Sequence, residues 1–224
     1  MLVTQIPFAF PVSTFAPPAV AFFGLGTGYL IYCPGELFGF PKRSPSVDRT
    51  TGLWGIWMPG FMHFLTGMFL FVGLAWFHTF VEKPLYMAAV AFTAYGVHWF
   101  AIGAARYTGS DPKPNGFMSI AFTMISALGI VVFFKGGDWP VGTLFCGLTL
   151  IYISDFFASL KIGMRTPSMD TTSVGDTREP HGEVRTVNVG EMSLGFWHLL
   201  TGLWLMYLTW ATVLNLASGL NLPL

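Results

Sequence analysis

Residues 116–134 read GFMSIAFTMISALGIVVFF, an apolar run without a charged side chain. Its length matches the roughly 20 residues of helix that cross the ~30 Å hydrocarbon core of a bilayer. Further apolar stretches, each bounded by proline, glycine or charge, lie at 18–32, 53–80, 85–105, 140–160 and 192–216. Backbone groups in lipid must be paired internally, and continuous apolar runs exclude the alternating strands of a barrel. The sequence therefore predicts an all-α membrane protein with six transmembrane helices.

The composition indicates the same class of protein. Of 224 residues, 53% are hydrophobic and 10% are charged, whereas soluble domains carry about 25% charged residues. The net charge is zero, so nothing points to a nucleic-acid partner. Cys33 and Cys146 lie in separate apolar segments without metal-ligand spacing. We therefore expect no disulfide, no metal site and no cofactor, and no nucleophile–base arrangement indicates an enzyme.

The polar links between the apolar stretches predict the orientation. They are short except for residues 161–190, which are predicted to form an extramembrane loop of one six-span domain covering 1–224. The links after the first, third and fifth spans hold nine Lys and Arg residues, against two in the other links. The positive-inside rule places these three links in the cytoplasm and both termini outside. The expected location is the cytoplasmic membrane of a bacterium or an archaeon.

Short sequence matches relate the spans to one another. Residues 19–22 and 89–92 both read AVAF, and residues 143–145 (TLF) lie at the corresponding place in the fifth span. Leu25, Tyr95 and Leu148 follow one helical turn further along the same face. Residues 63–67 (HFLTG) match residues 198–202 (HLLTG) in the same way. The chain is therefore predicted to use one helical hairpin three times, around a central solute path.

The repeat predicts a constriction in that path. Three like hairpins packed as a ring would bring Leu25, Tyr95 and Leu148 to one depth, and a bulky apolar ring with a single hydroxyl suits a narrow point that strips water from small solutes. Alternatively, the three are ordinary core residues and the repeat is a coincidence of apolar composition. The other candidates for the pore lining or a proton relay are Phe22, His63, Phe92, His98, Phe117, Phe145 and His198.

Ionisable side chains within the spans cost free energy in lipid, and they often mark a solute path or a proton relay. Imidazole titrates near neutrality, so His63, His98 and His198 could gate by pH or carry a proton with a weak acid. A neutral imidazole hydrogen-bonded to a neighbouring helix is the alternative. Asp155 lies inside the fifth span and Glu36 just after the first. Asp155 is either a proton acceptor on the path or reaches the cytoplasmic interface.

Two further stretches resemble a known family. Residues 91–99 (AFTAYGVHW) are similar to the AFTSYGSFW stretch of the acetate uptake transporter (succinate–acetate permease) family. Residues 213–215 (VLN), with Gly219 and then Leu222 and Pro223, resemble its C-terminal VLN…G…LP pattern. The resemblance implies a hexamer of six-helix protomers, each with a path for acetate and related small carboxylates, often coupled to protons. The family's constricting residues fall on Leu25, Tyr95 and Leu148.

The chain also departs from that family's pattern. The asparagine before the first span is missing, His63 replaces a usual glutamine, and family members generally have both termini in the cytoplasm. The related amide and proton-gated urea channel family also forms hexamers of six-helix protomers, and its termini-out topology agrees with the charge count. Three hypotheses follow: a homo-oligomeric channel or permease for small monocarboxylates such as acetate, a channel for urea or short amides, and a redox or structural subunit of a membrane complex.

Overall fold

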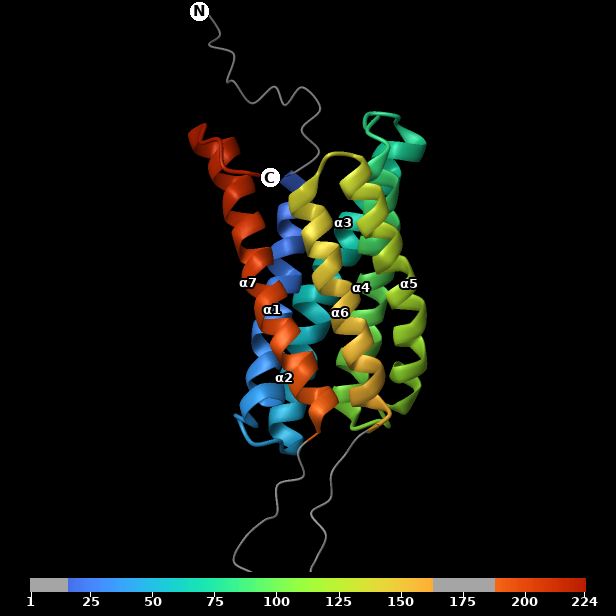
Figure 1. The fold of residues 1–224 in the computed structure, drawn as a ribbon, viewed down its shortest axis with the longest axis vertical. Coiled ribbons are helices and arrows are strands. Elements are labelled where there is room, and N and C mark those ends of the chain that lie inside the picture. Colours follow the sequence, from blue (N-terminus) through green and yellow to red (C-terminus); the bar gives the residue numbers. More distant parts are fainter. Residues whose placement is uncertain (1–15, 163–187) are drawn as a thin grey trace, which may run out of the picture.

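The computed structural model describes residues 16–162 and 188–224, and every regular element within these ranges is helical. The elements are α1 (Ala16–Phe38), α2 (Pro45–Gly55), η1 (Ile56–Phe61), α3 (Met62–Phe71), η2 (Val72–Trp76), α4 (Pro84–Thr108), α5 (Lys113–Lys135), α6 (Trp139–Ser159) and α7 (Val189–Ser218). The stretch from α2 to η2 is one continuous helix, so six helices run side by side along the bundle (Figure 1). Five are long and apolar enough to cross a membrane, and α1 is the sixth. The predicted all-α membrane fold is confirmed.

The first helix is longer than predicted. The expected span ended at Tyr32, but α1 continues through Pro34 to Phe38. Glu36, which was expected after the span, therefore lies in the last turn of α1. Its carboxylate is hydrogen-bonded to His198 of α7 at 2.6 Å, which satisfies this polar group inside the bundle. The buried face of α1 carries tyrosines as well as apolar residues, because this helix packs mainly against protein.

The second helix begins and ends earlier than predicted. It starts at Pro45 instead of Leu53, because the Ser44 side chain accepts the N–H of Val47 as an N-cap and proline suits the first turn. It ends at Trp76, short of the predicted Phe80. Within it, Pro59 cannot donate a backbone hydrogen bond, and the helix there takes the wider π form of η1. The remaining four spans lie within three residues of their predicted bounds.

The helices pack as a closed ring, but the pairing differs from the predicted hairpins. The most extensive packing joins α1 with α7, α5 with α6, and the helix of α2 and α3 with α4. These pairs are offset by one span from the hairpins of the sequence repeat. Small residues allow the close approach: a Cβ on Gly96 of α4 would lie 2.5 Å from the backbone nitrogen of Phe64.

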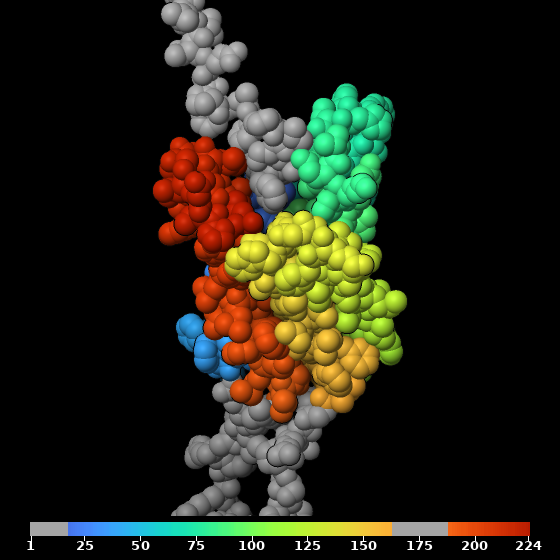
Figure 2. All heavy atoms as spheres, turned by 45° about the horizontal axis from the view of Figure 1, so that its top comes forward, coloured from blue at the N-terminus to red at the C-terminus, as the bar shows by residue number. Residues whose placement is uncertain are grey.

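The described chain begins and ends at the same end of the bundle (Figure 1), as an even number of helices requires. We call this the terminal end, and the opposite one the basic end. Of the eight Lys and Arg residues described, only Lys83 and Lys135 lie at the terminal end. There, the end of α7, the turn between α5 and α6 and the end of the second helix form separate prominences (Figure 2). Most of the predicted loop 161–190 lies outside the described residues.

The C-terminal VLN…G…LP pattern forms a local clamp. The Asn215 side chain donates to the carbonyl of Leu222 and accepts from its backbone N–H, both at 2.8 Å. Tyr207 donates to the carbonyl of Pro223 at 2.9 Å. Gly219 takes the left-handed conformation that ends α7 and allows the chain to turn back. These bonds hold the last residues against α7.

Candidate functional site

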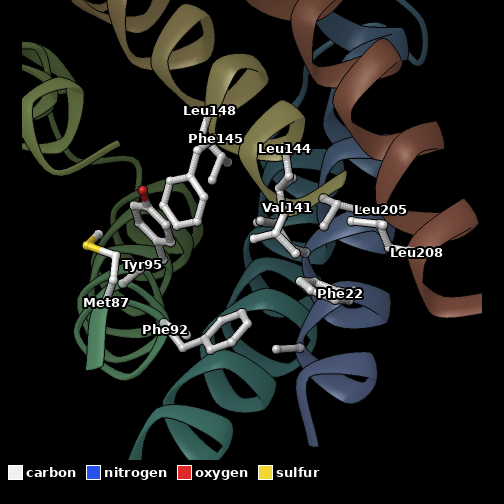
Figure 3. Packing of buried hydrophobic residues seen from close by; sticks show 14 of the residues in the cluster. Phe22, Met87, Phe92, Tyr95, Val141, Leu144, Phe145, Leu148, Leu205 and Leu208 are labelled. Carbon is white, nitrogen blue, oxygen red and sulfur yellow. The ribbon is translucent and has the colours of Figure 1, made fainter. Parts of the chain in front are cut away.

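A cavity of about 510 Å³ lies between the helices on the side of the terminal end. Its wall is mostly apolar and comes from α1, α3, α4, α5, α6 and α7. Aromatic side chains of three of these helices, Phe22, Phe92 and Phe145, point toward the common space (Figure 3). Glu82, in the link before α4, and Asp138, the N-cap of α6, line its outer part. We call this the terminal cavity.

The three residues that the repeat singles out meet in this cavity. Leu25, Tyr95 and Leu148 all line it, and their exposed fractions are only 2%, 2% and 1%. Because α1, α4 and α6 all run from the terminal end to the basic end, equal offsets along them correspond to similar depths. The structure thus brings together the residues that the repeat predicts to be neighbours. Whether they form the narrowest point for a solute remains a prediction.

A second cavity, of about 230 Å³, lies on the side of the basic end. Tyr29, His98 and Tyr152 line its inner part, three or four residues beyond Leu25, Tyr95 and Leu148 on the same helices. One helical turn, about 5.4 Å, therefore separates the two layers of side chains. We call this the basic cavity. The two cavities approach the same layer of the bundle from opposite ends.

Polar side chains are paired within the basic cavity. Nδ1 of His98 and the hydroxyl of Tyr152 are hydrogen-bonded at 3.1 Å. The Asp155 carboxylate accepts hydrogen bonds from the hydroxyls of Ser119 on α5 and Ser159 on α6. Asp155 lines the basic cavity one turn before the end of α6, and both alternatives for its role remain predictions.

Glu36 and His198 form a short hydrogen bond in this region. Nδ1 of His198 lies 2.6 Å from Oε2 of Glu36, and their side chains are 7% and 11% exposed, in that order. The His198 ring also stacks on Tyr29, with centroids 4.5 Å apart and planes 21° apart. Sequence reasoning missed Tyr29 and Tyr152, although extending the repeat by one more turn beyond Leu25 and Leu148 reaches both.

The mouth of the basic cavity carries the cationic side chains. Arg106 of α4 lies over the Tyr32 ring at 4.5 Å and donates from Nε to Asp48 at 3.0 Å. Arg43, which is largely exposed, donates to the same carboxylate at 3.2 Å. Lys161 also lines the mouth. The two arginines share one carboxylate, and Glu191 in the first turn of α7 also lines this cavity.

The Tyr95 hydroxyl has a defined hydrogen-bond direction. The Ser126 hydroxyl donates to the carbonyl of Phe122 at 2.6 Å, which uses its single hydrogen. Its bond with the Tyr95 hydroxyl, at 2.9 Å, must therefore be donated by Tyr95. The phenol oxygen of Tyr95 can then only accept a further hydrogen bond. At the inner end of the terminal cavity it offers a solute an acceptor and no donor.

The histidine candidates divide between the cavities. His63 lines the terminal cavity, whereas His98 and His198 line the basic cavity. The matched HFLTG and HLLTG segments therefore do not place His63 and His198 at the same depth. Both helices begin at the basic end, but His198 lies closer to the start of α7 than His63 lies to the start of the second helix. Across the described ranges, no group of three or more His, Cys, Asp and Glu residues could hold a metal ion.

Phe117 was predicted to line the pore, and the structure contradicts this prediction. It lies near the start of α5 with 65% of its surface exposed, and it lines neither cavity. An apolar residue in a span faces either the interior or lipid, and hydropathy alone does not distinguish these two environments. Phe117 lies on the outer surface of the protomer.

The described residues form an all-α integral membrane protein with a cavity on the side of each end of the bundle. No family model matches the sequence, and no curated protein matches it. Among solved structures, the chain is similar to the bacterial acetate channel SatP, with a TM-score of 0.65 and 14% sequence identity. The match covers 91% of this chain and 94% of that chain. The fold expected from the family resemblance is confirmed.

Proposed function

We propose that this protein is a channel or permease for small monocarboxylates such as acetate. The observation that carries the proposal is that Leu25, Tyr95 and Leu148 line the terminal cavity, while residues one helical turn beyond them line the basic cavity. The fold shared with an acetate channel supports it. The protein is proposed to work as a homo-oligomer, with a hexamer as first choice, and with one path in each protomer.

The chemistry of the layer favours small solutes. Bulky apolar side chains offer no replacement for lost water, so a solute that crosses must be small and weakly hydrated. A short carboxylic acid presents a methyl group to Leu25 and Leu148 and a polar end to the phenol of Tyr95. Larger or multiply charged solutes would require both more space and more dehydration.

Uptake by purified protein in liposomes tests the proposal. Radiolabelled acetate should enter these vesicles faster than it enters protein-free vesicles of the same lipid. Leu148→Trp should fill the layer and abolish the excess uptake, whereas Leu203→Trp is the matched control, because Leu203 on α7 is 54% exposed and faces outward. Uptake no faster than in protein-free vesicles, or equal uptake by the Leu148→Trp protein, contradicts the proposal.

A channel for urea or short amides is the second candidate. The phenol of Tyr95 accepts hydrogen bonds. Among the described residues, Glu82 and Asp138 line the terminal cavity but no Lys or Arg does, which suits neutral donors as well. Uptake of urea and formamide by the same vesicles separates the two candidates. An absorption spectrum of the purified protein tests the redox-subunit hypothesis, which requires a coloured sample.

A further inference from the structure

The seam between α4 and α5 is the least closed part of the helix ring. Among the neighbouring helices of the ring, these two pack least extensively against one another, whereas α5 packs closely on α6 (Figure 1). A groove of about 540 Å³ follows the seam. Val90 and Val97 of α4 line this groove and are 42% and 53% exposed, so the groove opens onto the outer surface of the protomer. We call it the lateral groove.

The lateral groove is long and mostly apolar. It extends over residues 90–101 of α4, which corresponds to about 16 Å of helix at 1.5 Å per residue. Phe71, the last residue of α3, lines its far end, toward the terminal end of the bundle. Among the described residues, the polar side chains of the lining are Thr93, His98 and Asn115. An extended hydrocarbon chain therefore suits the groove in length and in chemistry.

The lateral groove and the basic cavity share a wall. His98 and Asn115 line both spaces. The His98 ring lies against Phe122 of α5, with centroids 4.6 Å apart, and Phe122 lies against Tyr152 of α6 at 5.1 Å. Because Phe122 lines the groove and Tyr152 lines the basic cavity, a layer of aromatic rings separates the two spaces. The groove is thus continuous with a polar region only at its basic end, beside Asn115.

Hydrogen-bond donors gather at this basic end of the seam. Arg106 lies in the last turn of α4 and Asn115 in the first turn of α5, and both line the basic cavity. The Arg106 side chain is 16% exposed, and its Nε lies 3.0 Å from the Asp48 carboxylate, which orients the guanidinium. A guanidinium and a side-chain amide both offer N–H groups, and a carboxylate can only accept. This end therefore suits a carboxylate, since charge-assisted hydrogen bonds are the stronger ones.

The acidic residues of the basic cavity do not compete for these donors. Glu36 and Glu191 belong to α1 and α7, which form the side of the ring opposite to the α4–α5 seam. Asp155 of α6 lies nearer, and it accepts hydrogen bonds from Ser119 and Ser159. A carboxylate beside Asn115 is thus closer to Arg106 than to the carboxylates across the cavity.

We propose that the lateral groove binds a single-chain carboxylate amphiphile, such as a long-chain fatty acid. Its alkyl chain lies along the seam between α4 and α5, and its carboxylate lies at Asn115 and Arg106. An alkyl chain gains little free energy on moving from lipid into an apolar groove, because lipid tails are equally apolar. The head group therefore distinguishes this ligand from the surrounding lipid. The site goes beyond the proposed function and does not depend on it.

Photochemical attachment in lipid vesicles tests the site in the full-length protein. The probe is lauric acid with a diazirine at the methyl end of its chain, used at alkaline pH so that its carboxyl group is ionised. Illumination should attach it to Phe71 and Val90, at the far end of the groove. Unlabelled laurate should prevent attachment at a concentration about tenfold below that of lauryl alcohol, because hydrogen bonds to charged groups contribute more than neutral ones.

Two variants and one matched control examine the two parts of the site. Ala101→Phe fills the groove and should abolish attachment at its far end. Ala104→Phe, also at an exposed position of α4 but lining neither the groove nor a cavity, should behave as wild type. Asn115→Leu keeps the size of the side chain and removes the amide, so it should lower the preference for laurate over lauryl alcohol several-fold.

Three results overturn the inference. Attachment at Leu203, which is 54% exposed on α7, at the level seen in the groove means that the groove holds only bulk lipid. Attachment at Leu203 but not in the groove means that a second copy of the chain covers the seam. Equal competition by laurate and lauryl alcohol removes the selection for a carboxylate. If Ala101→Phe does not fold, the attachment sites and the competition in the wild-type protein still decide. Since attachment is measured instead of uptake, failure of the acetate experiment leaves this inference standing.

Discussion

The α-carbon of Gly67 lies so close to Thr93 that a methyl group on it would be 2.2 Å from Thr93 Oγ1 and 2.6 Å from its backbone nitrogen. A side-chain rotation cannot relieve the second contact. The segment that holds Gly67, α3, is therefore in backbone contact with α4. Gly202, at the matching position of the HLLTG segment, is in a looser environment, because its nearest neighbour would be the Cβ of Tyr29 at 3.2 Å.

This difference predicts unequal effects of the same substitution. Gly67→Ala should force α3 and α4 apart, at a cost of about 1–3 kcal/mol of stability, as overpacking typically does. Gly202→Ala should cost less. Gly35→Ala should not destabilise, because no atom of residues 16–162 or 188–224 lies within 4 Å of a Cβ there. Thermal unfolding of the three variants in detergent gives the comparison. Equal losses at Gly67 and Gly202 would contradict the packing described.

Truncation of Leu148 separates a path residue from a core residue. In a packed core, Leu→Ala costs about 2–5 kcal/mol, and Leu208, which is 0% exposed and lines neither cavity, should behave in this way. Leu148→Ala should cost less, because its lost contacts are partly with the cavity. It should also admit propionate and butyrate beside acetate in liposome uptake. A stability loss equal to that of Leu208→Ala, with unchanged size selection, would make Leu148 a core residue.

Tyr95→Phe removes one acceptor and keeps the aromatic ring. Ser126 retains its bond to the carbonyl of Phe122, so the loss of stability should be within about 1 kcal/mol. Acetate exchange should fall several-fold, because the acid loses its hydrogen-bond partner at the layer. Tyr86→Phe is the control, since Tyr86 lies on α4 with 54% of its surface exposed. Unchanged exchange in the Tyr95→Phe protein would show that the phenol oxygen has no role in passage.

The orientation in the membrane remains a prediction from the charge count, and it is testable at described positions. Asp111 lies between α4 and α5 at the basic end, and Lys83 lies before α4 at the terminal end. In intact cells, a membrane-impermeant thiol reagent should label Lys83→Cys and should not label Asp111→Cys. The parent protein, with only the partly buried Cys146 and the buried Cys33, gives the background. The opposite labelling pattern would place both termini in the cytoplasm.

The sequence by itself determined the features that depend on local chemistry. Apolar runs and their polar boundaries predicted six spans, because hydropathy and helix length are properties of one segment at a time. The sequence repeat also predicted that Leu25, Tyr95 and Leu148 are neighbours. Residues at the same distance from the start of parallel helices lie at similar depths. The sequence does not predict that α1 extends past Glu36, because a single charged residue gives no sign of its partner.

Only the tertiary structure decided what depends on distant segments. The bond between Glu36 and His198 joins residues 162 positions apart, and the outward position of Phe117 depends on which face of α5 meets α6. The direction of the Tyr95 hydrogen bond is set by a serine on another helix. Such relationships depend on the axial register in which neighbouring helices pack. The 3.6-residue periodicity of one helix shows which residues share a face, but it does not specify this register. The spans are therefore predictable from each segment alone, whereas the side chains that line the two cavities are brought together by the packing.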